Sequence, residues 1–380
     1  MLSFLQVNLH KAEIATTLLG QRFENSSHKI GLLTEPHTVF NKITGFPRGT
    51  KLLYDRNCRQ GAPPRAGIVS TRDLTVTALD SLTHRDCAAG LVKIGGKNTL
   101  LISAYLDINL EATPPWLENL FDLATKRGWP LLLGIDTNAH STLYGPDTNK
   151  RGEEIENLIL SKQLTVENYG LAPTYETRRG TVHVQTHIDV TLSRDLPLPI
   201  TNWRVDRDYN GSDHNTVLFD VPTPTPAKDR VRPWSKADWP TFQNYLANAD
   251  FKLPAAMSMK KLDKLVDRIY QHLYAALDLA CPEVEVEGKL GGSMWATEKH
   301  VQKKKRVSDL YNKAKQTKLD ADWASYKAAD KCFKKLCKKD KNRAWREYKE
   351  KLQSEKEVAS LIKLAPVSYT HLTLPTTPYV

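Results

Sequence analysis

Short runs of apolar residues recur through the first 221 residues of the chain. Their length and their content of Leu, Ile and Val predict β-strands. The runs are Leu2–Val7, Ile30–Thr34, Ala66–Ser70, Leu91–Ile94, Leu100–Tyr105, Leu131–Ile135, Ile188–Leu192 and Val217–Val221.

Other stretches of this part repeat apolar residues at helical spacing. In Ala12–Phe23, for example, Ile14, Leu18 and Leu19 fall on one face. Trp116–Lys126 and Glu153–Ser161 are the other predicted helices. Strands mixed with such helices favour a domain of β-sheets covered by helices.

A proline-rich segment, Pro222-Thr223-Pro224-Thr225-Pro226, follows the last predicted strand. Proline lacks an amide donor and fixes its own φ angle, so this segment fits neither a central strand nor a helix interior. We therefore expect the first domain to span residues 1–221, followed by a linker and connector over residues 222–254.

Beyond the connector, apolar residues again keep spacings of three, four or seven, which predicts amphipathic helices. Val307, Tyr311 and Ala314 belong to one such set, and lysines such as Lys338 occupy the gaps between the apolar positions. We expect residues 255–365 to form a basic helical segment. Residues 366–380 are rich in Thr and uncharged, and they resemble read-through into a sequencing adaptor, so we expect a non-native tail there.

The excess of positive over negative charge lies in the second part of the chain. The formal net charge is +11, yet residues 1–221 hold 23 Lys and Arg against 24 Asp and Glu. An electroneutral domain joined to a basic segment is typical of a catalytic domain with an appendage that meets an anionic polymer. Solvated lysine-rich helices without a partner are the alternative.

Composition argues against a membrane or secreted protein. No uncharged apolar run approaches the roughly 20 residues that span a bilayer, and the N-terminus lacks the pattern of a signal peptide. The five cysteines form no Cys-x-x-Cys pair, so neither a disulfide framework nor a zinc knuckle is indicated. We expect a nuclear or cytoplasmic protein with no membrane partner.

Polar residues that can bind metal or phosphate appear repeatedly where a predicted strand begins or ends. In α/β proteins ligands gather outside strand ends, so these residues could converge on one site. They are Asn8, Glu35, Tyr105, Asp136, Asn138, Asp189, Asp213 and His214.

Each of these residues also has a purely structural explanation. Asp136 and Asn138 could form an Asx turn that bonds neighbouring backbone amides. Glu35-Pro36 could open a loop, and Ser212-Asp213-His214 could be a surface turn. The whole set in this order is harder to explain by local structure alone.

Taken in order, these motifs resemble the endonuclease/exonuclease/phosphatase superfamily, and most closely the apurinic-type endonuclease domain of non-LTR retrotransposon polyproteins. The resemblance covers about residues 2–221. It implies a four-layer α/β sandwich of two packed mixed β-sheets flanked by helices, here followed by a basic helical C-terminal segment. The motifs are Gln6-Val7-Asn8-Leu9, Leu32-Leu33-Thr34-Glu35-Pro36, Ser103-Ala104-Tyr105, Gly134-Ile135-Asp136-Thr137-Asn138-Ala139-His140-Ser141, His187-Ile188-Asp189-Val190-Thr191 and Gly211-Ser212-Asp213-His214.

The resemblance also implies roles for these residues. Glu35 would bind a metal ion, Asn8 would orient metal or phosphate, and Asp213 would contribute on the metal side or structurally. Asp136 and Asn138 would position the attacking water and a phosphate oxygen. Asp189 would orient His214, and Tyr105 and His214 would contact the scissile phosphate.

These residue types suit phosphodiester hydrolysis on chemical grounds as well. The reaction needs an in-line water, a group that orients it, and positive charge near the phosphate oxygens. Mg²⁺, or Mn²⁺, suits a site with one or two carboxylates and the substrate phosphate as ligands. A carboxylate beside a histidine favours the charged imidazole, which can donate to phosphate near neutral pH.

Two positions depart from the family pattern. His10 stands where many relatives carry an acidic residue, which weakens the expectation of a second metal ion. Leu106-Asp107 follows Tyr105, where Pro or Asn is common.

We therefore expect a metal-dependent DNA endonuclease whose nick in target duplex DNA leaves a 3′-hydroxyl for target-primed reverse transcription by a retrotransposon. The chain contains no Tyr-x-Asp-Asp motif of a polymerase. The basic segment could contact DNA or the RNA of the element. Alternatives are an abasic-site repair endonuclease, a related phosphatase, or an inactive nucleic-acid-binding module.

Overall fold

The computed structural model describes residues 1–25, 28–47, 49–59, 61–223, 230–249, 259–285 and 296–350. Contacts group the chain into two compact units, each considered by itself. The larger one comprises residues 1–71, 76–225 and 289–380, and the smaller one residues 72–75 and 226–288. Most of the first predicted domain therefore lies in the larger unit, together with residues from the C-terminal segment.

One six-stranded sheet is built around the N-terminal strand β1. Its order is β15-β16-β1-β2-β6-β5. Strands β1 and β2 are parallel, whereas the other neighbours are antiparallel, so the sheet is mixed. The strands are β1 (Leu2–Asn8), β2 (Ile30–Thr34), β5 (Lys51–Leu53), β6 (Ala66–Ser70), β15 (Thr201–Asp206) and β16 (Thr216–Val221).

A second six-stranded sheet has the order β11-β14-β10-β9-β8-β7. Its parallel pair is β9 and β10, and the other neighbours are antiparallel. The strands are β7 (Thr77–Ala78), β8 (Cys87–Ile94), β9 (Lys97–Tyr105), β10 (Leu131–Asp136), β11 (Thr165–Val166) and β14 (Asp189–Arg194).

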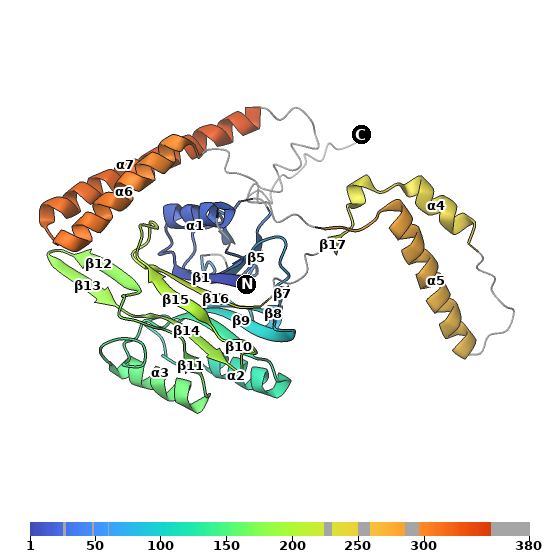
Figure 1. The fold of residues 1–380 in the computed structure, drawn as a ribbon, viewed down its shortest axis with the longest axis horizontal. Helices are drawn as coiled ribbons and strands as arrows, with labels where there is room; N and C mark the ends of the chain where they lie inside the picture. The colour runs from blue at the N-terminus through green and yellow to red at the C-terminus, as the bar shows by residue number, and fades with distance from the viewer. Residues whose placement is uncertain are drawn as a thin grey trace, which may run out of the picture. The chain divides into compact units, whose positions relative to one another are not determined.

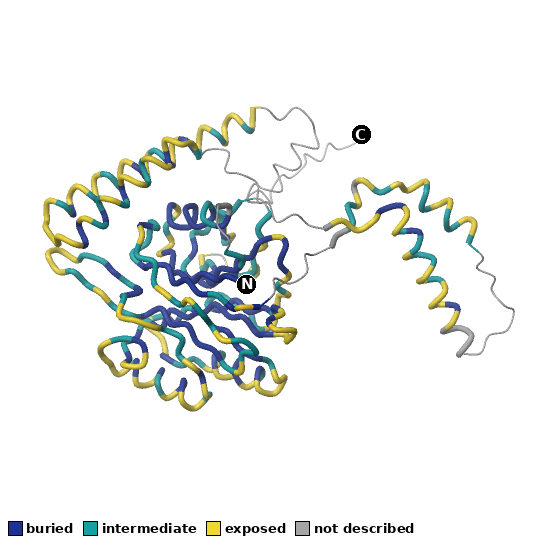
Figure 2. The backbone as a smooth tube through the Cα atoms, viewed as in Figure 1, coloured by how far each residue is buried: buried dark blue, intermediate teal, exposed yellow. Residues whose placement is uncertain are grey.

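Helices cover the outer faces of both sheets (Figure 1). Helix α1 (Glu13–Asn25) buries Ala15, Leu19 and Phe23 against the first sheet. Helices α2 (Pro115–Arg127) and α3 (Lys150–Ser161) pack apolar side chains against the second sheet. The expected four-layer α/β sandwich is confirmed, and Figure 2 shows its strands as largely buried.

Buried hydrogen bonds join the two sheets across the apolar core. The Gln6 side chain on β1 donates to the Val190 carbonyl at 3.1 Å and accepts from the Thr191 hydroxyl at 2.9 Å. The Ser103 hydroxyl on β9 donates to the Leu33 carbonyl on β2 at 2.7 Å. Because hydrogen bonds are directional, these contacts define how one sheet lies over the other.

Several short elements were not predicted. Strands β12 (Tyr175–Arg179) and β13 (Val182–Thr186) form a separate antiparallel hairpin. A second hairpin pairs β3 (Thr38–Val39) with β4 (Lys42–Ile43), and a 3₁₀ turn, η1, spans Asp80–Leu82.

The predicted helices of the basic segment are present as a long hairpin, α6 (Glu298–Thr317) and α7 (Asp320–Glu350). The hairpin belongs to the larger unit, where Tyr311, Trp323 and Phe333 pack with Ile14 and Tyr209 of the sandwich. The boundaries expected at residues 221, 254 and 365 stay predictions that limited proteolysis can test. Most of the proline-rich segment, the end of the predicted basic segment after residue 350, and the expected tail lie outside the described residues.

The described part of the smaller unit contains β17 (Arg230–Val231), η2 (Trp234–Lys236), α4 (Trp239–Ala247), α5 (Met259–Ala280) and β18 (Val284–Glu285). Strands β17 and β18 pair with each other. Within the described ranges, none of the helices combines the length and apolar character that a membrane span needs.

Candidate active site

The predicted polar residues lie at one end of both sheets. Asn8 ends β1, Glu35 follows β2, and His214 precedes β16 in the first sheet. In the second sheet, Asp136 at the end of β10 stands opposite Tyr105 on one side and Asp189 on the other. The parallel strands direct their carboxyl ends to the same edge, which brings residues distant in sequence together.

Asp136 is at the centre of this edge and is 1% exposed. One of its carboxylate oxygens accepts from the Asn8 side-chain amide at 2.7 Å, and the other accepts from the backbone N–H of Asn138 at 3.1 Å. Burial, together with the nearby Asp189 carboxylate, raises the pKa of Asp136 to about 7. The carboxylate is thus held in place by amides of two different strand ends.

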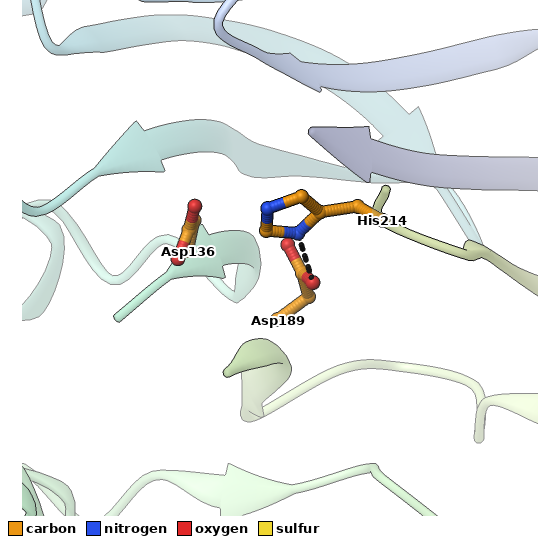
Figure 3. Close-up of side chains that lie close together, drawn as sticks. All are labelled: Asp136, Asp189 and His214. Carbon is orange, nitrogen blue, oxygen red and sulfur yellow. Dashed lines mark hydrogen bonds and ion pairs between the residues drawn. The ribbon is translucent and has the colours of Figure 1, made fainter. Parts of the chain in front are cut away.

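Asp189 and His214 form a buried pair, with exposures of 2% and 5%. The Asp189 carboxylate is 2.8 Å from His214 Nδ1, as Figure 3 shows. Burial alone would lower the pKa of His214, but the charge and hydrogen bond of Asp189 outweigh it, aided by Asp136, and the pKa rises to about 9. His214 is therefore charged at neutral pH.

Asp136, Asp189 and His214 form a compact cluster (Figure 3). One ligand atom from each lies within 4.8 Å of the other two, and all three residues are buried. The cluster combines two carboxylates, one with a raised pKa, and one charged imidazole. These groups can accept or donate a proton next to a bound phosphate, and the carboxylates can help to bind a divalent cation.

Glu35 approaches the same edge on a strained backbone with φ of +44°. This left-handed conformation is uncommon for a residue with a side chain. The Glu35 N–H donates to the Arg65 carbonyl, and its own carbonyl accepts from the Lys11 N–H, both at 2.7 Å. Its carboxylate lies 2.9 Å from the ammonium of Lys11, whose side chain is exposed. Glu35 stands outside the compact cluster.

Tyr105 lies against Arg65, a residue that the sequence analysis did not identify as part of the site. The Arg65 guanidinium is 4.7 Å from the centre of the Tyr105 ring and binds the carboxylates of Asp86 and Asp107, each at 2.5 Å. Burial, and then the charges of Glu35 and Asp136, raise the pKa of Tyr105 to about 12, so it keeps its proton. Asp107, one of the departures from the family pattern, thus anchors the cation beneath Tyr105.

Asn138 lies in the loop after β10 with φ of +47°. Its side-chain amide donates to the Leu106 carbonyl at 3.0 Å, which ties this loop to the one that follows Tyr105. Arg151 reinforces the tie, because it donates to the carbonyls of Thr137 at 3.1 Å and Asp107 at 3.1 Å. These bonds tie the loops after β9 and β10 together.

Asp213 and His10 form an ion pair at the rim of the site, with Nδ1 of His10 3.1 Å from the Asp213 carboxylate. The hydrogen bond to Asp213 raises the pKa of His10. Ser212 links this rim to β1, because its hydroxyl donates to the Asn8 carbonyl at 2.8 Å. The other departure from the family pattern, His10, thus faces an acidic residue of the site.

A divalent cation fits the donors at this edge. Asp136 is buried, and the groups that bond its carboxylate are neutral amides, so an added cation would offset the cost of its charge. Glu35, Asn8 and Asp213 offer further oxygen atoms at the same edge, and oxygen is the preferred donor for Mg²⁺. Asp136, Asn8, Glu35 and Asp213 are therefore the residues that could hold it.

Comparisons with known proteins agree with this architecture. A family model described as Endonuclease-reverse transcriptase matches residues 99–218. The structure resembles the solved endonuclease domain of TRAS1, a telomere-specific non-LTR retrotransposon, with 28% sequence identity and a TM-score of 0.52. That match covers 58% of this chain and 99% of the TRAS1 domain.

A curated relative is the 115 kDa protein of the type-1 retrotransposable element R1DM of Drosophila melanogaster. It is 25% identical over 301 residues, which cover 74% of this chain. The chain spans only 28% of the length of that relative. The two mixed sheets, the site at their common edge and these matches make the chain similar to the endonuclease domains of the endonuclease/exonuclease/phosphatase superfamily that non-LTR retrotransposons carry.

Proposed function

We propose that the chain is a divalent-metal-dependent endonuclease that nicks duplex DNA and leaves a 3′-hydroxyl for target-primed reverse transcription. The observation that carries this proposal is the buried cluster of Asp136, Asp189 and His214, joined to Asn8 by a 2.7 Å hydrogen bond. The similarity to the TRAS1 endonuclease domain and to the R1DM protein supports DNA as the substrate.

The roles of the residues follow from their protonation. Asp136, with Asn138 beside it, orients the attacking water and accepts its proton, while the oxygen of the water bonds to phosphorus. The bond between phosphorus and the 3′ oxygen breaks, and the leaving oxygen takes up a proton from solvent water to become the 3′-hydroxyl, while Asp136 returns the proton that it accepted to solvent. His214 stays charged beside Asp189 and donates a hydrogen bond to a phosphate oxygen.

Neutral donors would complete the contacts to the phosphate. Tyr105 keeps its proton and can donate it in a hydrogen bond, and the amides of Asn8 and Asn138 can do the same. Mg²⁺, or Mn²⁺, held by Glu35 and Asp136 with help from Asn8 and Asp213, would supply positive charge near the phosphate oxygens. These assignments extend the roles expected from the sequence.

Nicking of supercoiled plasmid DNA tests the proposal. We expect the full chain to nick in Mg²⁺ or Mn²⁺, to stop in EDTA, and to lose activity on the order of 100-fold or more in Asp136→Ala and His214→Ala. Asp122→Asn is the matched control, because this exposed carboxylate on α2 only pairs with Lys162. Equal activity in the wild type and either site variant would refute the enzyme assignment.

Two further substrates separate the proposed reaction from the alternatives on the same fold. An abasic duplex cut far faster than intact duplex would identify a repair endonuclease, and release of phosphate from an inositol phosphate would identify a phosphatase. No hydrolysis, together with DNA binding, would leave an inactive binding module.

The proposal includes partners and a place of action. Target DNA is the substrate, and the basic segment contacts nucleic acid, with DNA and the RNA of the element as the candidates. A nuclear or cytoplasmic location belongs to the same proposal.

A further inference from the structure

The α6–α7 hairpin is docked on the nuclease domain through an apolar and polar interface. Val307, Tyr311 and Phe333 pack with Tyr209 of the domain. The Tyr209 hydroxyl donates to the Asp330 carboxylate, and Lys341 pairs with Glu13, the first residue of α1, at 2.8 Å. The hairpin thus has a defined position on the domain that carries the site.

The opposite side of α7 is a stripe of cations, here called the α7 basic face. At 100° per residue its members fall within one third of the helix circumference, whereas Phe333 and Cys337 of the docked side point the other way. All are exposed, and none forms an ion pair within the described residues. The face consists of Lys327, Lys331, Lys335, Lys338, Lys339, Arg346 and Lys349.

Acidic side chains of this part of α7 lie off the basic face. Asp330 bonds Tyr209 and Lys334, and Asp340 is buried beside His300 and Arg343. Glu347 falls on another side of the helix, near Arg343. Among the described residues, carboxylates therefore leave most of the positive charge of the face unpaired, and a nearby carboxylate is that of Glu13, whose pKa is lowered mainly by Lys341 with a smaller contribution from Lys338.

The basic face has about the length of one turn of duplex DNA, and the hairpin that carries it contacts elements next to the site. From Lys327 to Lys349 an α-helix rises about 33 Å, close to the roughly 34 Å of one turn of duplex DNA. Lys341 of α7 contacts α1, and α1 begins five residues after Asn8. Lys315 of α6 contacts Glu176. The residue before Glu176, Tyr175, has its ring 4.9 Å from the ring of His214. The hairpin therefore flanks the catalytic edge.

We propose that the α7 basic face binds phosphates of duplex DNA beside the position of the nick. This inference rests on the proposed function. Within the basic segment, the α7 basic face is the part that binds nucleic acid, and duplex DNA is its partner. Each lysine that contacts a phosphate releases a condensed counterion, which favours binding most at low salt.

The test compares two triple variants of the full chain. Lys331→Gln, Lys335→Gln and Lys339→Gln remove three charges from the face. Lys93→Gln, Lys97→Gln and Lys126→Gln remove three exposed charges near the opposite ends of β9 and β10. Binding to a 30-base-pair duplex and to RNA of equal length is measured by fluorescence anisotropy in EDTA, across a range of salt, so that no cleavage occurs.

We expect the face variant to lower the slope of log affinity against log salt by up to about 3 and to weaken duplex binding up to about 100-fold at 0.15 M salt. The control variant should change both much less. Equal losses in the two variants, no loss at all, or a loss confined to RNA would overturn the inference. Nicking by the wild type is assayed separately, so a failure of the proposed endonuclease function can be distinguished from a failure of the proposed DNA binding by the α7 basic face.

A separate observation concerns Lys315 of α6, which enters a buried carboxylate cluster of the nuclease domain. Its ammonium lies 2.8 Å from the carboxylate of Glu176, and the two side chains are 6% and 0% exposed. Glu176 also accepts from Arg207 at 2.9 Å and from Gln185 at 2.8 Å. Lys315 in turn donates to the Arg207 carbonyl at 3.1 Å.

The backbone beside Glu176 holds the segment that carries His214. The Glu176 N–H donates to the Asp213 carbonyl at 2.8 Å, and the Asn215 N–H donates to the Thr174 carbonyl at 2.6 Å. Without Lys315, the buried Glu176 carboxylate would keep Arg207 as a partner but would be less neutralised, and its shift toward solvent would disturb these contacts. We infer that Lys315 is a positioning residue that fixes His214 through Glu176.

The variants Lys315→Met and Lys315→Met/Glu176→Gln test this inference. The single variant leaves a buried carboxylate with less neutralisation, so we expect kcat for nicking to fall on the order of 10-fold with little change in KM. The double variant removes both charges and should recover most of the kcat. Lys313→Met is the control, because Lys313 is an exposed lysine of the same helix that pairs with Asp322 of α7 and not with Glu176.

Melting temperatures are measured in parallel. A Lys315→Met protein with wild-type kcat, or a double variant that recovers its melting temperature without recovering kcat, would overturn the inference. Wild-type nicking tests the proposed function, and the variants test only the role of Lys315.

Discussion

The charged state of His214 makes Asp189→Asn an informative substitution. The amide has the shape of the carboxylate but no charge, and it replaces a partner that lies 2.8 Å from His214 Nδ1 in a buried pair. The folded protein holds the pKa of His214 at about 9, against an ordinary value of 6.5. At about 1.36 kcal/mol per unit, this difference corresponds to roughly 3 kcal/mol of unfolding free energy.

The sign of the pH dependence follows from the direction of the shift. A group with a raised pKa contributes its full stability below its unfolded value, here 6.5, and loses that contribution as the pH rises through about 9. In Asp189→Asn the pKa of His214 should fall well below 9, because burial then opposes the charged form with less compensation. The wild type should therefore exceed the variant in stability most at pH 6, and the difference should shrink toward pH 9.5.

Urea denaturation of the full chain in EDTA at pH 6, 7.5 and 9.5 measures this difference. Asp122→Asn serves again as the surface control and should match the wild type at each pH. An Asp189→Asn protein that is destabilised by the same free energy at pH 6 and pH 9.5 would show that His214 is not charged in the folded state.

Other substitutions test the surroundings of the site. Asn8→Ala removes an amide donor from Asp136, so the pKa of Asp136 should rise further. Nicking should fall roughly 10-fold, and the acidic limb of the pH–rate profile should move to higher pH. A limb that does not shift would contradict this expectation. Tyr209→Phe removes the hydrogen bond to Asp330 and should cost about 1–3 kcal/mol, seen as a lower melting temperature with the hairpin still present; an unchanged melting temperature would count against the docking interface. Gly152→Ala places a Cβ 1.6 Å from the His140 carbonyl oxygen, so the start of α3 must shift. The shift should cost about 1–3 kcal/mol of unfolding free energy, measured by urea denaturation. A variant as stable as the wild type would show that the loop around His140 can move without cost.

Apolar periodicity predicted the strands of the sandwich well, because buried strands need continuous apolar runs. Strand β2 has the predicted bounds Ile30–Thr34, and the polar residues at the strand ends lie at one edge. Helix α3 begins at Lys150, before the predicted Glu153, because the Asn149 side chain caps it by accepting from the Gly152 N–H at 2.8 Å. Caps of this kind determine helix starts that apolar spacing alone does not show.

The β12–β13 hairpin could not be read from apolar spacing. Its strands are largely polar and only partly buried, so they lack a clear hydrophobic face. Gly180, with φ of +61°, marks the turn between them and was the available signal. Because the hairpin was not predicted, neither Glu176 nor Tyr175 could be identified as a neighbour of the segment that carries His214.

Long-range ion pairs account for the rest of what was missed. Arg65 binds Asp86 and Asp107 from a loop, and Lys315 reaches Glu176 from a helix that follows the proline-rich segment. No periodicity or local motif connects such partners, because the pairing depends on tertiary packing. Composition revealed only that the second part is basic, whereas the structure shows which of its lysines are buried and which are exposed.

Donors from both sheets make up the catalytic edge, so its chemistry depends on how those sheets are aligned. Apolar packing is non-directional and tolerates small sliding movements, whereas the buried bonds of Gln6 and Ser103 do not. A slight slip between the layers would separate Asn8 from Asp136 and yet cost little hydrophobic burial. The nicking rate and the thermal stability can therefore change independently in this fold. The polar residues between the two sheets determine how the sheets are positioned more than they add to the stability of the fold.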